Sequence, residues 1–390
     1  MPTIPQWEDW EALTVFAGVL RERIRYEGAE VLLRRALCGR EKELGAENSD
    51  TLASVNNLGR LLKYMGDDEG AEAMVRRSLE GYEKALGAEH PSTLGGVDNL
   101  GFLLRDKGLY AEAEALHRRA LEGREKVLGA RHVDTLKSVC NLAILLRCKG
   151  DKEAAEVLCR RALEGRERAL GANHPSTLAS VNNLGNLLKD QGDYGGAEML
   201  YRRALDGFCK ALGAEHPNTL TSATALGQLL RYKGDLKGAE DLHRRALEGF
   251  KKVFGEEHPD TLRAEFNLGV SLFSSSFKGA EFLFQRALEG YKKVLGAENR
   301  KTLTKVEIVG KFISWNDRVA AKKFVLDYIN SHPSTERYLN YTLACFASLE
   351  GDLDAAKLLI TSHLEAFPQR KARSMEDPDL AAIRDFIETL

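Results

Sequence analysis

A seven-residue cassette recurs along most of the chain at a nearly fixed interval. It reads GAEHPST at 87–93 and returns as GARHVDT (129–135), GANHPST (171–177), GAEHPNT (213–219) and GEEHPDT (255–261). Weaker copies are GAENSDT (45–51) and GAENRKT (296–302). Successive copies begin 42 residues apart five times and 41 residues apart once. An interval of this size is typical of a repeat array, in which each unit packs its hydrophobic face against the next.

Each unit contains two stretches with helical periodicity, as residues 176–212 show. The first stretch has one apolar face, formed by Leu178, Val181, Leu184, Leu187 and Leu188. The second has another, formed by Ala197, Leu200, Tyr201, Ala204, Leu205, Phe208 and Leu212. Gly192 and Gly213 follow the two stretches, and glycine suits the left-handed end of a helix. The pattern predicts an all-α chain of helix pairs.

Small residues recur where the two helices of a unit must approach each other closely. In the same unit they are Gly185, Ala197 and Ala204. The equivalent sets are Gly59/Ala71/Ser78, Gly101/Ala113/Ala120, Ala143/Ala155/Ala162, Gly227/Ala239/Ala246 and Gly269/Ala280/Ala287. A large side chain at such a position would separate the helices at a cost of about 1–3 kcal/mol.

These residues resemble the tetratricopeptide repeat (TPR). The matching positions are Leu184, Gly185, Gly192, Tyr194, Ala197, Tyr201 and Ala204. The 42-residue spacing, the NNLG segment and the LGAEHPxT connector resemble the kinesin-light-chain type of TPR, over about residues 43–300. The resemblance implies a right-handed α-solenoid of about nine helix pairs whose first helices line a concave surface.

The resemblance and the spacing predict four parts along the chain. We expect a degenerate first unit in 1–44, with Phe16-Ala17 and Ala29 at its small positions, and the 42-residue array in 45–301. Two units with the ordinary TPR spacing of 34 residues should occupy 302–370. In 371–390 we expect a capping helix, because the open end of a solenoid needs a polar cap. That helix should be the single amphipathic stretch 378–390.

Composition and motifs exclude several function classes. The chain has 390 residues, 43% of them hydrophobic, and a net charge of −2, which gives no general attraction to nucleic acid or membranes. Six cysteines without a CxxC pair, no secretory signal and no apolar run near 18 residues predict a cytoplasmic protein. No nucleotide-binding, hydrolase or metalloprotease motif occurs. We therefore expect neither an enzyme nor a cofactor or metal site.

The repeated histidines are interpreted as helix-start signals. They are His90, His132, His174, His216 and His258. Equivalent positions in stacked helix pairs lie roughly 16–20 Å apart, whereas zinc needs nitrogen ligands at about 2.1 Å. Proline after histidine suits the first turn of a helix. Two other histidines, His117 and His243, fall with Cys159 at a packing position and are expected in the core.

Paired arginines such as Arg76-Arg77 recur in each second helix and invite a nucleic-acid interpretation. Salt-bridged outer faces are the better interpretation, since a glutamate precedes the first arginine by four residues. These pairs are Glu72→Arg76, Glu114→Arg118, Glu156→Arg160, Glu198→Arg202 and Glu240→Arg244. One turn further we expect Glu80→Lys84, Glu122→Lys126, Glu164→Arg168 and Glu248→Lys252.

Two rows of polar residues on the first helices remain as candidate binding residues. The asparagine row is Asn57, Asn99, Asn141, Asn183 and Asn267, interrupted by Ala225. The basic row is Lys63, Arg105, Arg147, Lys189 and Arg231. By resemblance, the asparagines match positions that hold an extended peptide backbone, to which an amide can donate and from which it can accept. The basic row would favour acidic groups. The alternatives are internal bridging by the asparagines and plain solubility for the basic row.

These observations predict a monomeric, non-catalytic scaffold that binds extended, acidic segments of partner proteins. The alternatives are a kinesin-light-chain-like cargo adaptor and a regulatory subunit of a larger complex, although residues 1–30 show no heptad coiled coil. An RNA-binding helical repeat would have a unit near 35 residues with variable rung residues. It is also open that the array is a spacer and that recognition resides near Trp7, Trp10 and Trp315.

Overall fold

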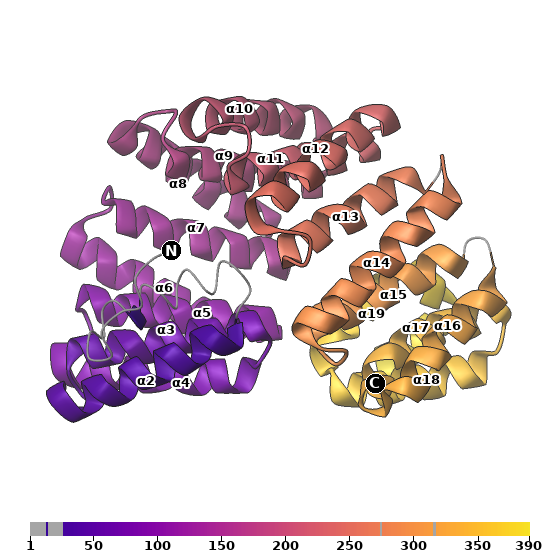
Figure 1. Ribbon diagram of the computed structural model, residues 1–390, viewed down its shortest axis with the longest axis horizontal. Helices are drawn as coiled ribbons and strands as arrows, with labels where there is room; N and C mark the ends of the chain where they lie inside the picture. Colours follow the sequence, from indigo (N-terminus) through magenta and orange to yellow (C-terminus); the bar gives the residue numbers. More distant parts are fainter. Residues whose placement is uncertain (1–12, 15–25, 274, 315–316) are drawn as a thin grey trace. The chain divides into compact units, whose positions relative to one another are not determined.

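The computed structural model describes residues 13–14, 26–273, 275–314 and 317–390, and in these ranges it consists of helices joined by short connectors, without a strand (Figure 1). The chain divides into two compact units, 1–283 and 284–390. Trp7, Trp10, Trp315 and the Phe16-Ala17 pair lie outside the described residues. The four-part division of the chain stays a prediction.

The first unit holds the 42-residue repeats as consecutive helix pairs. Its helices are α2 (Tyr26–Leu44), α3 (Ser49–Met65), α4 (Asp68–Leu86), α5 (Pro91–Lys107), α6 (Tyr110–Leu128), α7 (Val133–Lys149), α8 (Lys152–Leu170), α9 (Pro175–Gln191), α10 (Tyr194–Leu212), α11 (Pro217–Tyr232), α12 (Leu236–Phe254) and α13 (Pro259–Leu272). The next helix, α14 (Phe277–Leu295), contains the boundary between the units. From α3 to α12, each helix packs against the one before it and the one after it, as in a solenoid.

The second unit continues the pairing and ends in short helices. They are α15 (Arg300–Ser314), α16 (Arg318–Ser331), η1 (Pro333–Thr335), α17 (Glu336–Glu350), α18 (Leu353–Ala366), η2 (Pro368–Arg370), α19 (Lys371–Glu376), η3 (Pro378–Ile383) and α20 (Arg384–Thr389). The predicted helix over 378–390 is therefore two pieces, a 3-10 helix followed by a short α-helix. Leu380, Ile383 and Ile387 pack with α17 and α18, so the segment still covers the end of the array.

Within each pair the small residues allow the predicted close approach. Ala155, Ala197 and Ala204 are fully buried. A Cβ atom built on Gly185 would lie 2.9 Å from Cε1 of Tyr201, and one on Gly101 would lie 3.0 Å from Cε1 of His117. These contacts are too short for a larger residue, and this explains why glycine recurs there.

The ends of the helices follow local signals. Gly66 and Gly192 end α3 and α9 with φ of 86° and 87°, a left-handed conformation that glycine adopts without strain. The next residue, Asp67 or Asp193, then caps the second helix, with its Oδ1 accepting from a backbone N–H at 2.8 or 2.9 Å. Both of these pairs are thereby closed by a tight turn.

Ion pairs cover the outer faces of the second helices. All five predicted Glu→Arg pairs are present, for example Glu72–Arg76 at 2.8 Å and Glu240–Arg244 at 2.5 Å. In four doublets the other arginine binds a glutamate of the preceding second helix, as Arg119 binds Glu83 at 2.5 Å. In the fifth, Arg245 reaches Cys209 instead. One turn further the prediction is partly wrong. Glu164–Arg168 forms at 3.6 Å, but Lys126 and Lys252 bind Glu89 and Glu215.

Candidate functional site

Each first helix is fixed at its start by the residue that precedes it. The ring Nδ1 of His90, His132, His174, His216 and His258 accepts a hydrogen bond from the backbone N–H two residues later, at 3.0–3.2 Å. Asn48 does the same with its Oδ1 at 2.9 Å. The histidines therefore start helices, as predicted. The spacing of the histidines did not indicate that the imidazole itself is the cap.

One side of each first helix in the first unit is exposed to solvent. On α7, residues Lys137, Asn141, Ile144 and Cys148 are exposed or half-exposed and lie three or four residues apart, whereas Val139, Cys140 and Leu142 between them are buried. The equivalent sides of α3, α5, α9, α11 and α13 are also partly exposed. We call these sides together the first-helix surface.

The asparagine row lies on this surface, but its members have different surroundings. Asn57, Asn141 and Asn183 are half-buried, and their side chains form no hydrogen bond with any described residue. Asn99 differs, because its Nδ2 donates to Asn56 Oδ1 at 3.1 Å across neighbouring repeats. The Nδ2 of Asn267 is buried without a partner among the described residues. Asn99 therefore bridges neighbouring repeats. The other three half-buried amides can still form hydrogen bonds with a bound partner.

The basic row is partly neutralised by acids on the same surface. Lys63 binds Asp106 of the next first helix at 2.9 Å, and Arg147 binds Asp190 at 2.6 Å. Burial acts to raise the pKa of Asp106, but the charges of Lys63 and Arg105 outweigh it and hold the pKa below its usual value. Asp106 is therefore a stable partner for these cations.

The remaining basic residues are less fully paired. Arg105 binds Asp106 at 2.8 Å and lies over the ring of Phe102. Lys189 is 3.8 Å from Asp190. Arg231 has no ion pair within the described ranges, and its guanidinium lies 4.8 Å from the centre of the Tyr232 ring. Within the basic row, Arg231 is therefore the member without a carboxylate partner in the described ranges.

Variable residues also line this surface, and the sequence interpretation missed them. Three residues after each asparagine position stand Arg60, Phe102, Ile144, Asn186, Gln228 and Val270. Exposed aromatic side chains occur here, with Tyr64, Phe102 and Tyr232 46%, 42% and 56% exposed. Tyr232 also stacks with Tyr194, their ring centres 6.3 Å apart. The signal was available, since an aromatic residue on the polar side of a helix indicates a contact surface.

A group of possible metal ligands lies in the second unit, at Cys345, Asp377 and Asp379. Lys311 Nζ is 2.9 Å from an oxygen of Asp377 and 3.4 Å from one of Asp379. Burial raises the pKa of the Cys345 thiol, which disfavours the thiolate that a metal would need. The arrangement anchors the C-terminal segment to α15 through an ammonium ion, and its donors do not fit a metal site.

None of the helices in the described ranges has the length and apolar character needed to cross a membrane.

Comparisons with known proteins bear on the repeats. Family models described as tetratricopeptide repeat match residues 11–50 and 51–92, and then 89–164, 153–210, 181–252 and 230–293. These matches cover more than half of the chain. None of the curated proteins matches it.

Several solved structures are similar. One is a putative kinesin light chain from Podosopora anserina with nearly identical TPR-like repeats (25% identity, TM-score 0.43, 53% of this chain and 98% of that one). Another is BtubC (BKLC) from P. vanneervenii (24%, 0.49, 59% and 92%). A Rap protein complexed with Competence and Sporulation Factor is similar in fold (14%, 0.57, 92% and 98%).

Proposed function

The chain belongs to the tetratricopeptide repeat family, and on that premise we propose that it is an interaction scaffold whose first-helix surface binds an extended segment of a partner protein. The observation that carries the proposal is the set of half-buried amides at Asn57, Asn141 and Asn183, which have no hydrogen-bond partner in the described ranges. These amides are half-exposed and not committed to another described residue, so they can pair with a bound segment. An extended backbone offers each amide both a carbonyl and an N–H.

Side chains beside the amides suggest where the partner's side chains lie. Phe102 and Ile144 offer apolar contacts next to Asn99 and Asn141. Because Lys63 and Arg147 already bind Asp106 and Asp190, we place an acidic residue of the partner near Arg231 instead of along the whole basic row. The cargo-adaptor and regulatory-subunit alternatives stay predictions, as do the monomeric state and the cytoplasmic location.

A peptide selected for binding would test the proposal whatever the natural partner is. We would select binders from a displayed library of random peptides, synthesise one, and measure its Kd for the chain. Asn141→Leu and Asn183→Leu should each weaken binding roughly 3- to 10-fold, since each removes a hydrogen bond contributing about 0.5–1.5 kcal/mol. Asn173→Leu, in an exposed connector, is the matched control and should not change the Kd. Equal affinities for all variants would refute this binding surface.

A further inference from the structure

Two connectors of the first unit are tied to second helices by the same ion pair. Glu89, in the connector before α5, binds Lys126 near the end of α6 at 2.9 Å. Glu215, before α11, binds Lys252 near the end of α12 at 2.7 Å. In both cases the lysine follows the glutamate by 37 residues. The same ion pair therefore occurs in two helix pairs, α5–α6 and α11–α12.

In the α7–α8 pair, arginine stands at both positions that form this ion pair elsewhere. Arg131 stands at the position of Glu89, and Arg168 at the position of Lys126. Arg131 forms no ion pair or hydrogen bond with any described residue, and Arg168 reaches only Glu164, at 3.6 Å. Two like charges thus stand where the α5–α6 and α11–α12 pairs have opposite charges.

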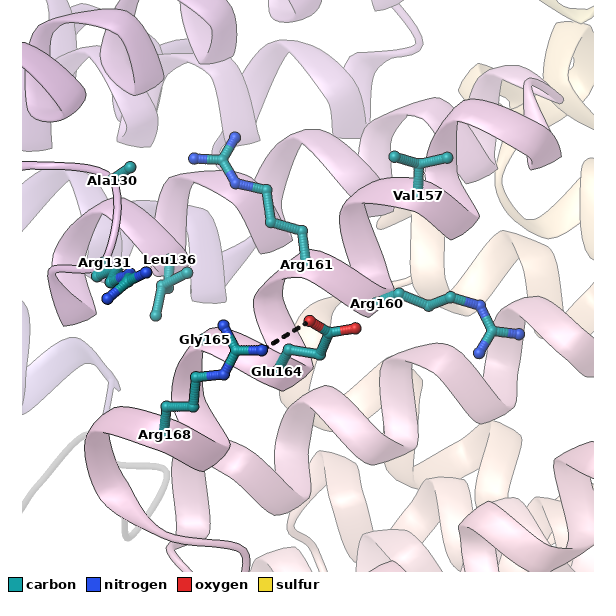
Figure 2. A pocket seen from close by; sticks show the side chains of 9 residues that line it. All are labelled: Ala130, Arg131, Leu136, Val157, Arg160, Arg161, Glu164, Gly165 and Arg168. Atoms are coloured by element: carbon teal, nitrogen blue, oxygen red, sulfur yellow. Dashed lines mark ion pairs between the residues drawn. The ribbon is translucent and has the colours of Figure 1, made fainter.

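The two arginines line one cavity of about 500 Å³, shown in Figure 2. Its lining is Ala130, Arg131, Leu136, Val157, Arg160, Arg161, Glu164, Gly165 and Arg168. Arg160 points to the opposite side from Arg131 in this view and binds Glu156 at 2.7 Å. Arg161 binds Glu125. The cavity therefore carries the incompletely paired charge of Arg131 and Arg168, beside apolar atoms of Leu136 and Val157.

We propose that this cavity is a binding site for a phosphate monoester or inorganic phosphate, held between Arg131 and Arg168. A planar guanidinium donates two parallel hydrogen bonds to phosphate oxygens, and two guanidinium groups match the charge of about −2 that such a group carries near neutral pH. The ligand takes the place that the glutamate carboxylate has in the α5–α6 and α11–α12 pairs. The site is formed by a connector and a second helix, so it does not depend on the first-helix surface.

The substitution Arg131→Glu tests the proposal because it introduces the ion pair of the α5–α6 and α11–α12 pairs. Without phosphate, we expect this variant to melt at a higher temperature than the wild-type chain, since Glu can bind Arg168. Phosphate added at constant ionic strength should raise the Tm of the wild-type chain only. By calorimetry, the variant should bind inorganic phosphate at least 10-fold more weakly.

The reverse substitution, Glu89→Arg, is the matched control. It places an arginine opposite Lys126 and should create a phosphate response at a second pair. A blocked phosphoserine amide, titrated beside inorganic phosphate, identifies the source: tighter binding of the amide indicates a phosphorylated protein segment, and tighter binding of the ion indicates free phosphate. If phosphate raises the Tm of the wild-type chain and of Arg131→Glu by the same amount, the effect is a general one of the salt and the site is refuted.

Discussion

His117 and Asp98 are in contact inside the α5–α6 pair, with Nδ1 of the ring 2.9 Å from Oδ1 of the carboxylate. Asp98 also accepts from Arg124 and from Ser138 Oγ, the latter at 2.8 Å. All four side chains are buried. One repeat later, the positions of Asp98 and His117 hold Cys140 and Cys159, and the corresponding Arg166 binds neutral groups only. The α5–α6 pair and Ser138 of α7 thus form a charged core network that the next repeat lacks.

This network predicts a loss of stability in Asp98→Asn. Burial acts to raise the pKa of Asp98, but the hydrogen bond to His117 and the charge of Arg124 outweigh it and lower the pKa below its ordinary 3.8. The carboxylate therefore stabilises the fold fully above pH 3.8, and this contribution is lost as the pH falls below that value. At pH 7 the variant should lose about 3–5 kcal/mol in urea unfolding, because Arg124 stays buried without its counter-ion. Wild-type stability in the variant would contradict the network.

His243 predicts a second pH dependence, at higher pH. The ring is 1% exposed, and burial lowers its pKa from 6.5 to about 4. Between these values the unfolded chain binds a proton that the folded chain does not, so stability falls as the pH drops from 6.5 toward 4, by up to about 3 kcal/mol.

The variant His243→Phe should lose this part of the pH dependence, since Phe284 fills the equivalent position. His174→Asn is the control, because Asn48 shows that asparagine can cap a first helix. Thermal unfolding at pH 7, 6, 5 and 4.5 would measure the difference. If the Tm of the wild type and of His243→Phe falls by the same amount as the pH is lowered, this ring does not cause the acid sensitivity.

Ala155→Phe should destabilise the α7–α8 pair. Ala155 is fully buried where the two helices approach each other, so the larger ring would force them apart at a cost of about 1–3 kcal/mol. Ala115→Phe is the matched control, since Ala115 is exposed on the second helix α6. Guanidinium unfolding of both variants would measure the effect. If the two variants had the same unfolding midpoint, the packing described here would be contradicted.

We expect substitutions in the asparagine row to lower the stability of the chain at Asn99 but not at Asn141. Asn99→Leu removes the hydrogen bond to Asn56 and should cost about 0.5–1.5 kcal/mol. Asn141→Leu breaks no hydrogen bond within the described ranges and should leave the urea midpoint nearly unchanged. An equal loss in both variants would indicate that Asn141 also has a structural role.

Lys311→Met should loosen the C-terminal segment 371–390. The substitution removes the ammonium contacts to Asp377 and Asp379 at 2.9 and 3.4 Å. Hydrogen bonds to charged groups contribute about 1.5–3 kcal/mol, so amide exchange in this segment should become at least tenfold faster. Lys322→Met, which breaks a more exposed pair with Glu350, is the control and should leave exchange there unchanged. Slow exchange in both variants would show that the apolar contacts alone hold the segment.

The candidate site was predicted in outline but not in its details. The sequence placed the asparagine row on the first helices, and Asn141 and Asn183 lie there on a half-exposed side. It could not distinguish Asn99, whose partner Asn56 belongs to the preceding repeat. Nor could it show that Asp106 neutralises Lys63. Such pairs depend on how neighbouring helices are stacked, and spacing within one helix does not contain that information.

The sequence by itself determined the helix pairs, their starts at residues such as His90 and the close approach at residues such as Ala155. These features follow from signals within one or two turns of helix, which the 42-residue period repeats and so makes easy to recognise. Only the tertiary structure decided which charges meet. Lys126 has a glutamate four residues before it on its own helix, yet it binds Glu89 of the connector. A long charged side chain on a helix surface can reach several partners. The distances between neighbouring elements determine which ion pair forms.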